Sequence, residues 1–111
     1  MAGELVYFVI PTRQGERAKR FYGELFGWRF GEGNVPGGSQ IENTNPAGGM
    51  FENPEGTVPQ VFFQVDDIHA AVERVRELGG EGAEPQRVES GWMAACRDDQ
   101  GVELNLWAPA S

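Results

Sequence analysis

The chain repeats its own pattern after 53 residues, and this repeat limits the possible folds more than any other feature of the sequence. In the first half, a predicted strand at residues 5–10 precedes a predicted helix at residues 15–27. In the second half, a predicted strand at residues 61–65 precedes a predicted helix at residues 68–78. One offset that aligns both a strand and a helix indicates a structural unit that is used twice.

Both predicted helices carry the apolar stripe of an amphipathic helix. The apolar residues stand at i, i+3, i+4, i+7 and i+8 in the first helix, and the second helix differs only in its last position, i+10. Gly27 follows the first stripe, where a helix end favours left-handed backbone, and Asp67 precedes the second stripe as an N-cap. The two stripes are Ala18, Phe21, Tyr22, Leu25 and Phe26, and Ile68, Ala71, Val72, Val75 and Leu78.

Three short strands are predicted after each helix, separated by turns rich in glycine. The same offset aligns residues 48–52 with residues 101–105. Each half is therefore predicted to be a βαβββ module, and 111 residues suit one domain. The modules span about residues 4–54 and 59–108, and their last three strands are expected at 28–30, 39–43 and 49–52, and at 83–88, 91–97 and 102–107.

The composition excludes several classes of partner. Asp and Glu outnumber Lys and Arg by 17 to 9, a net charge of -8, which disfavours nucleic acid and weakly favours cationic ligands through steering. No apolar run approaches the roughly 20 residues of a membrane span, and the N-terminus lacks a signal-peptide pattern. Cys96 is the single cysteine, so it forms no disulfide within the chain. A cytoplasmic protein is expected.

Several sequence segments resemble the vicinal-oxygen-chelate (VOC) superfamily of glyoxalase I, bleomycin-resistance proteins and extradiol dioxygenases. They are Arg-Phe-Tyr-Gly-Glu-Leu-Phe-Gly-Trp at 20–28, Val-Asp-Asp-Ile at 65–68, Glu-Leu-Gly-Gly at 77–80 and Asp-Asp-Gln-Gly at 98–101. The resemblance implies an α+β fold in which two βαβββ modules form a cupped, barrel-like mixed sheet with two helices outside. It also implies a homodimer, because dimerisation often completes or buttresses the cup.

In metal-binding members of the superfamily, four side chains from the first and last strands of each module hold the ion. The matching positions here are Tyr7, Glu52, Gln60 and Asn105. One carboxylate, two amides and a phenol are poor ligands for a divalent transition ion. No metal or other cofactor is therefore expected, unless this mapping is wrong; a shift of two residues would replace Asn105 by Glu103.

Strand alternation predicts which side chains line the cup. In residues 60–65 and 102–107, one face of each strand is apolar and is expected to pack under a helix. The opposite face would give an apolar wall with a few polar groups, as in small-molecule sites. Alternatively, Glu103 and Asn105 face solvent on an edge strand, and the aromatic residues only fill the core. The predicted ligand-binding residues are Tyr7, Glu52, Gln60, Phe62, Gln64, Glu103, Asn105 and Trp107.

Three functional hypotheses follow. The first is a metal-free protein that binds a small aromatic or cationic organic molecule in the cup, as the bleomycin-resistance branch sequesters a compound without catalysis. The second is an enzyme, either a glyoxalase-type lyase or isomerase or a dioxygenase with an atypical metal site, or one with Glu52 or Glu103 as a general base. The third is a dimeric interaction module that binds no ligand.

Overall fold

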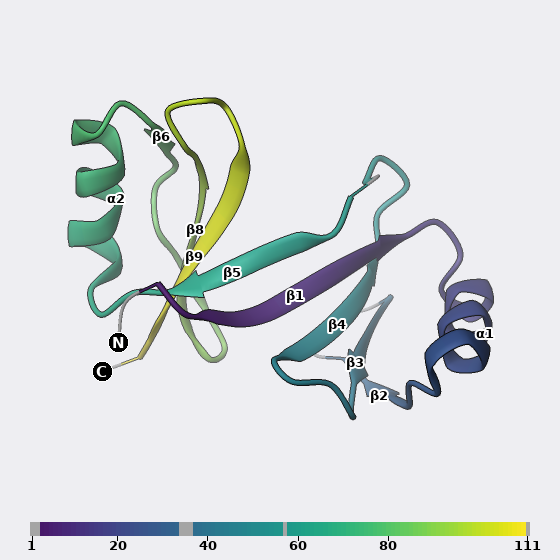
Figure 1. The fold of residues 1–111 in the computed structure, drawn as a ribbon. Coiled ribbons are helices and arrows are strands. Elements are labelled where there is room, and N and C mark those ends of the chain that lie inside the picture. Colours follow the sequence, from purple (N-terminus) through teal and green to yellow (C-terminus); the bar gives the residue numbers. More distant parts are fainter. Residues whose placement is uncertain (1–2, 34–36, 57, 111) are drawn as a thin grey trace. The chain divides into compact units, whose positions relative to one another are not determined.

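The computed structural model describes residues 3–33, 37–56 and 58–110. The chain divides into two compact units. We call residues 7–60 the N-terminal unit, and residues 61–111 together with 1–6 the C-terminal unit. The helix α1 belongs to the N-terminal unit and the helix α2 to the C-terminal unit (Figure 1).

The N-terminal unit takes its strands from the first repeat, although its first strand, β1 (Leu5–Thr12), begins in the C-terminal unit. The strands lie in the order β2-β3-β4-β1. β1 runs parallel to β4, whereas β2 with β3 and β3 with β4 are antiparallel. The remaining elements are α1 (Gly15–Phe26), β2 (Phe30–Glu32), β3 (Gly38–Ile41) and β4 (Ala47–Glu52).

The C-terminal unit repeats this arrangement. Its strands lie in the order β5-β9-β8, with β5 parallel to β9, and the short strands β6 and β7 both pair antiparallel with β8. The elements are β5 (Gln60–Gln64), α2 (Ile68–Glu77), β6 (Glu81–Gly82), β7 (Gln86–Val88), β8 (Gly91–Arg97) and β9 (Glu103–Pro109).

The predicted α+β fold is confirmed, and the predicted βαβββ order is present in the first repeat, whereas in the second repeat β6, β7, β8 and β9 follow α2. Three predicted strands need correction. The single strand predicted at 83–88 is wrong: β6 and β7 replace it on either side of Pro85, which has no N–H for a ladder bond. β1 continues through Pro11 to Thr12, beyond the predicted end at residue 10. β2 begins at Phe30, where the predicted strand ended.

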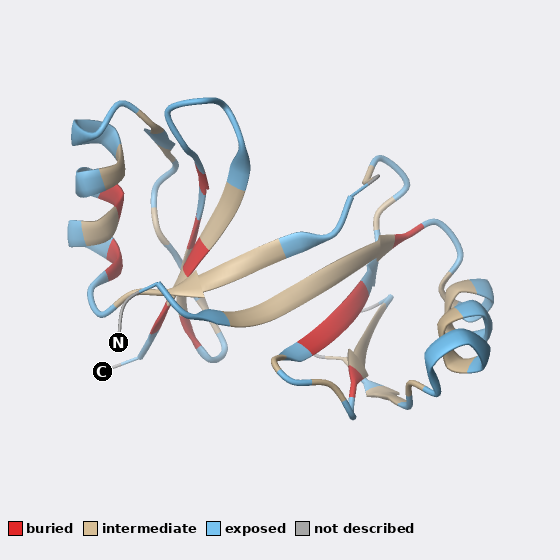
Figure 2. Cartoon of the chain, viewed as in Figure 1, coloured by how far each residue is buried: buried red, intermediate tan, exposed pale blue. Residues whose placement is uncertain are grey.

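The C-terminal unit has a hydrophobic core between α2 and one face of its sheet. Asp67 is the N-cap of α2, as predicted. Its carboxylate accepts hydrogen bonds from the backbone N–H groups of His69 (3.0 Å) and Ala70 (3.1 Å). Ile68 and Val72 on α2 are buried (Figure 2). The core consists of Ile68, Val72, Ala94, Cys96, Leu106 and Ala108, with Phe63, Val65, Ala71, Val75, Trp92 and Leu104 packed against it.

The N-terminal unit buries its helix less. Figure 2 shows no buried position on α1, which agrees with the exposures of its residues. Tyr22 stacks on Trp28 with ring centroids 5.2 Å apart, and Phe8 of β1 lies 5.9 Å from the same indole. α1 ends at Gly27 in the predicted left-handed conformation, with φ at 75°. An aromatic cluster therefore holds α1 to its sheet.

Candidate functional site

Five of the predicted ligand-binding residues share one face of the C-terminal sheet. The strand register pairs Phe62 with Asn105 and Gln64 with Trp107, so these four side chains point to the same side. The alternating residues Phe63, Val65, Leu104 and Leu106 lie on the other side, in or against the core under α2. The alternation predicted for β5 and β9 is thus confirmed. We call the side that carries Phe62, Gln64, Glu103, Asn105 and Trp107 the helix-free face.

The position of β9 tests the edge-strand part of the alternative interpretation of Glu103 and Asn105. β9 lies between β5 and β8, so the alternative that these residues stand on an edge strand is wrong. Asn105 is half-buried and its Nδ2 donates to the Val61 carbonyl at 3.4 Å, whereas Glu103 is exposed. Trp107 is half-buried and its indole N–H donates to Ser90 Oγ at 2.9 Å. That bond fixes the orientation of the indole ring.

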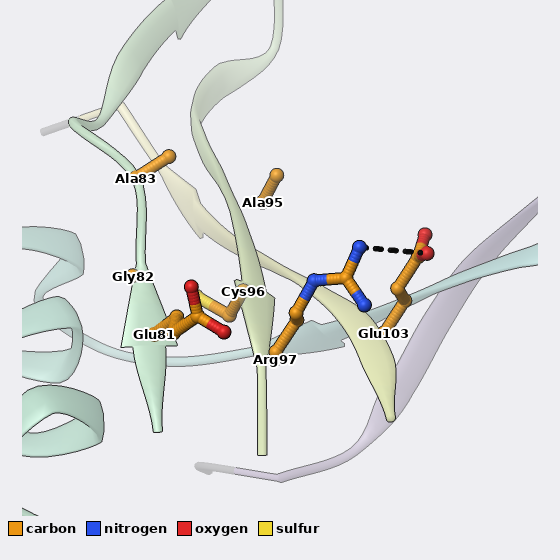
Figure 3. A pocket seen from close by; sticks show the side chains of 7 residues that line it. All are labelled: Glu81, Gly82, Ala83, Ala95, Cys96, Arg97 and Glu103. Atoms are coloured by element: carbon orange, nitrogen blue, oxygen red, sulfur yellow. Dashed lines mark hydrogen bonds and ion pairs between the residues drawn. The ribbon is translucent and has the colours of Figure 1, made fainter. Parts of the chain in front are cut away.

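A hollow of about 340 Å³ opens along strands β6, β8 and β9 (Figure 3). Ala83 and Ala95 lie to one side of it, and Ala83 N–H donates to the Ala95 carbonyl at 3.0 Å. Because alanine side chains are short, they leave space above the sheet at this point. The full lining is Glu81, Gly82, Ala83, Ala95, Cys96, Arg97 and Glu103.

A row of alternating charges borders the hollow. The register pairs Arg97 with Glu81 on one side and with Glu103 on the other. Arg97 Nη2 lies 3.2 Å from Glu103 Oε2 (Figure 3). Arg97 Nη1 donates to the Gly101 carbonyl at 3.3 Å. Within the described part of the chain, Glu81 has no ion-pair partner. The row therefore carries a net negative charge, and Glu81 is its unpaired carboxylate.

Tyr7 lies in the N-terminal unit, where its side chain crosses Gly49 of β4. Its hydroxyl donates a long hydrogen bond of 3.5 Å to Gln40 Oε1. Burial raises the pKa of the Tyr7 phenol above its ordinary value of 10.0, so the phenol is neutral near pH 7. Gln60 is the first residue of β5 and is exposed.

The predicted placement of Glu52 beside Tyr7 is wrong. The β1–β4 register pairs Tyr7 with Ala47 but pairs Thr12 with Glu52, so Tyr7 and Glu52 point to opposite faces. Glu52 instead reaches the first residue of α1: a Cβ added to Gly15 would lie 3.2 Å from Glu52 Oε2. A carboxylate at that position is stabilised by the partial positive charge of a helix N-terminus.

The error has a simple origin in the internal repeat. Phe62 follows Val9 by 53 residues, but their strand partners, Asn105 and Gly49, are 56 residues apart. The second module is therefore three residues longer before its last strand, and the counterpart of Asn105 is Gly49 instead of Glu52. A shift by an odd number of residues moves every side chain of a strand to the other face.

Comparisons with known proteins agree with this architecture. A model of the glyoxalase-like domain family matches residues 7–107. The chain belongs to the glyoxalase-like domain family. A protein of Mycobacterium tuberculosis (strain CDC 1551 / Oshkosh) named "Putative glyoxylase CFP32" is 30% identical over 111 residues, which cover 88% of this chain and 42% of that protein. A glyoxylase-like domain-containing protein of Didymella fabae is 32% identical over 91 residues, covering 70% of each.

Solved structures share the fold of this glyoxalase-like domain at low sequence identity. Methylmalonyl-CoA epimerase from Streptomyces coelicolor, in complex with 2-nitronate-propionyl-CoA, superimposes with a TM-score of 0.71 at 18% identity and covers 100% of both chains. Methylmalonyl-CoA epimerase from Mycobacterium tuberculosis gives a TM-score of 0.71 at 16% identity, covering 98% of this chain and 89% of that one. These two neighbours show that the chain shares their fold.

The four residues mapped to the metal-binding positions of this glyoxalase-like domain do not form a set of strong metal ligands. Glu52 points away from Tyr7, which leaves a phenol and two amides from the predicted set, and none of these is a strong ligand. Among the described residues, no group of three or more His, Cys, Asp or Glu side chains is placed to hold an ion. In the same part of the chain, no helix is long and apolar enough to cross a membrane.

Two charged residues of the hollow were missed by the sequence analysis. Alternation within residues 91–97 places Met93, Ala95 and Arg97 on the helix-free face, so this signal was available for Arg97. Glu81 joins them only through the pairing of β6 with β8. A strand of two residues has no detectable period, so Glu81 could not have been found in this way. The ligand-binding roles of the eight predicted residues stay predictions.

Proposed function

We propose that this glyoxalase-like domain binds a small aromatic or cationic organic molecule without a metal ion, on the helix-free face of its C-terminal unit. The observation that carries this proposal is the hollow beside Ala95, which is bordered by the unpaired carboxylate of Glu81. Its volume of about 340 Å³ falls within the range of roughly 300–1,000 Å³ typical of small-molecule pockets.

The charge around the hollow favours a cationic group on the ligand. Glu103 is paired with Arg97, whereas Glu81 has no ion-pair partner among the described residues. A cation near Glu81 would gain a charge-assisted contact that no protein group supplies. The net charge of -8 would also attract a cationic molecule from solution.

The aromatic residues favour a ring on the same ligand. Ala95 pairs with Asn105, which pairs with Phe62, so the Phe62 ring lies in the same cross-strand row as the alanine floor. Trp107 lies two residues further along β9, a displacement of about 7 Å. A molecule that joins a ring to a cationic group would span this distance, and stacking on a fixed indole would add specificity.

This proposal is tested by measuring the binding of aromatic amines, with aromatic acids of the same shape as anionic controls. Tryptophan fluorescence and thermal shift should report the amines and not the acids. Ala95→Phe should abolish binding because its ring fills the hollow. Glu81→Gln should weaken binding severalfold, whereas Glu84→Gln, which alters an exposed carboxylate paired with Arg76, should not. Equal binding by wild type and Ala95→Phe would refute the site.

The metal-free part of the proposal needs a separate measurement. Protein purified without a chelator should contain no stoichiometric transition metal by inductively coupled plasma mass spectrometry, and chelator should leave amine binding unchanged. About one equivalent of metal per chain would contradict this part and would favour lyase or dioxygenase chemistry.

A carboxylate-base enzyme is the second candidate, and the pairing of Glu103 with Arg97 favours it. Abstraction of a proton beside a carbonyl needs a base and a group that stabilises the enolate oxygen. Glu103 would supply the base, and the Arg97 guanidinium 3.2 Å away would supply the positive charge. Enzyme-dependent exchange of the acidic C–H of a bound carbonyl compound in D₂O, lost in Glu103→Gln, would distinguish this enzyme from a protein that only binds.

A further inference from the structure

We propose that the ligand of the helix-free face is an elongated arylalkylamine. Its ring stacks on Trp107, its ammonium group contacts Glu81, and its apolar linker lies over Ala95. This inference rests on the proposed function, because it concerns the same face, and it adds that one molecule reaches both ends. The positions of the three side chains follow from the pairing of β8 with β9 and with β6.

Ala95 lies midway between Trp107 and Glu81 in the sheet. Met93, two residues before Ala95 on β8, pairs with Trp107 of β9. Arg97, two residues after Ala95, pairs with Glu81 of β6, and β6 and β9 lie on opposite sides of β8. Two residues along a strand and one strand across give a displacement of about 8 Å in each direction. The three positions therefore form one diagonal, roughly 16 Å long between its outer Cα atoms.

The middle of this diagonal is low enough for a linker to cross it. Ala95 and Ala83 carry only methyl groups, and both are exposed in the hollow of about 340 Å³ (Figure 3). A chain of methylene groups has space above these methyl groups, and each methylene that leaves water contributes to binding. Glu81 lines the hollow but Trp107 does not, so the ring end of the ligand extends beyond the hollow.

The second diagonal through Ala95 does not combine a ring with an unpaired charge. Its ends are Gln86 of β7 and Glu103 of β9. The carboxylate of Glu103 is paired with Arg97 at 3.2 Å, and Gln86 has neither a ring nor a charge. In the described part of the chain, Glu81 has no such ion pair. The orientation of the ligand along the first diagonal follows from this difference.

The ring end of the site is held in place before a ligand binds. The Trp107 indole N–H donates to Ser90 Oγ at 2.9 Å, which makes Ser90 a positioning residue. A fixed indole loses little conformational freedom when a second ring stacks on it. Phe62 is a poorer platform, because Asn105 stands between it and Ala95 in the cross-strand row.

The length of the diagonal sets the length of the linker. The stacking of the two rings and the contact between ammonium and carboxylate occupy part of the distance, and the Glu81 side chain can lean toward the hollow. About 6–10 Å then remains between the ring and the nitrogen of the ligand. With carbon–carbon bonds of about 1.5 Å, a linker of about four to six carbon atoms covers this distance. Benzylamine, with a single linker carbon, reaches only one end.

Isothermal titration calorimetry with phenylbutylamine and benzylamine tests the proposal. Phenylbutylamine should lose about twofold to fivefold in affinity in Glu81→Gln and about twofold to tenfold in Trp107→Leu, because it contacts both ends. Benzylamine should lose affinity in only one of these variants. The matched controls, Glu84→Gln and Phe62→Leu, should leave the affinity for phenylbutylamine unchanged. A larger loss in Phe62→Leu than in Trp107→Leu would overturn the proposal.

A second test does not depend on the folding of Trp107→Leu. Ser90→Ala changes an exposed residue and releases the indole, so it should weaken phenylbutylamine severalfold and leave hexylamine, which has no ring, unaffected. Equal responses of the two amines would show that no ring stacks on Trp107.

The outcomes separate this inference from the proposed function on which it rests. If benzylamine and phenylbutylamine bind and respond alike to Glu81→Gln and Trp107→Leu, the face binds aromatic amines but no single molecule spans the diagonal. That result would overturn the inference and leave the proposed function standing. If none of the amines binds the wild type, both are overturned.

Discussion

Each unit of the chain has a strand followed by a helix and further strands, but the two units bury their helices to different depths. α2 places Ile68 and Val72 in a core with Leu106, and Val72 is only 2% exposed. α1 has no buried residue, although its apolar stripe is as regular as that of α2. A helical period thus predicts that a helix forms and which side is apolar, but not how deeply that side is buried.

The difference follows from the size of the side chains in each stripe. The stripe of α2 contains Ala71, Val72 and Val75, which are short and let the helix approach its sheet closely. The stripe of α1 contains three aromatic rings: Tyr22 stacks on Phe26 and on Trp28, and Phe21 meets Tyr22 edge-on. Phe8 fills the space above Gly48 on the sheet side. α1 is therefore held to its sheet through ring contacts, in which Trp28 touches both Tyr22 of α1 and Phe8 of β1.

The largest expected effect comes from truncating one leucine in each unit. Leu106→Ala should lower the free energy of unfolding by about 2–5 kcal/mol, because it leaves a cavity in the α2 core. Leu25→Ala should change it by less than about 0.5 kcal/mol, because that side chain is exposed. Urea denaturation followed by circular dichroism measures both, at protein concentrations low enough to exclude self-association. Equal losses would show that the units are equally packed.

A smaller effect is expected from adding a methyl group to the sheet of the N-terminal unit. Gly48→Ala should cost about 1–3 kcal/mol, since its Cβ would overlap the ring of Phe8. Gly23→Ala, in α1, should instead stabilise by about 0.5–1 kcal/mol, since its Cβ would meet only the Trp28 carbonyl at an ordinary 3.6 Å. Thermal unfolding measures whether each variant is less or more stable than the wild type. An unchanged stability of Gly48→Ala would mean that the Phe8 ring has room to move.

The helix starts give a third contrast. Asp67→Ala should cost about 1 kcal/mol, because it removes the side-chain acceptor for two backbone N–H groups of α2. Gln14→Ala should cost almost nothing, because the Gln14 side chain makes no capping bond to α1. The same denaturation experiment compares them, and a loss at Gln14 as large as that at Asp67 would contradict the assignment of the caps.

The smallest effect is a pH dependence that differs between the units. Burial raises the pKa of the Cys96 thiol above 9.0, an effect that nearby Arg76 partly offsets, and burial raises the pKa of Tyr7 above 10.0. Both groups bind their protons more tightly in the folded state, so stability should be unaffected below pH 9 and should fall as the pH rises through these values. Cys96→Ala should remove the earlier part of the decline, and Tyr7→Phe the later part. A stability that rises with pH in this range would contradict both shifts.

The sequence by itself determined the local features of this protein. The repeated strand and helix, the cap at Asp67, the left-handed Gly27 and the two faces of β9 all follow from patterns within about ten residues. Such features depend on backbone preferences and on the periods of a helix and a strand, which a short segment carries in full.

Only the tertiary structure decided the features that join distant segments. The three extra residues in the second module, which make Gly49 instead of Glu52 the counterpart of Asn105, appear only when β1 pairs with β4 and β5 pairs with β9. Glu81 lies opposite Arg97 because β6 pairs with β8. Strand register is fixed by loop length and by packing on both faces, and a shift of one residue reverses a side chain without changing the local pattern. The repeat therefore predicted the fold, and the strand pairing determined the site.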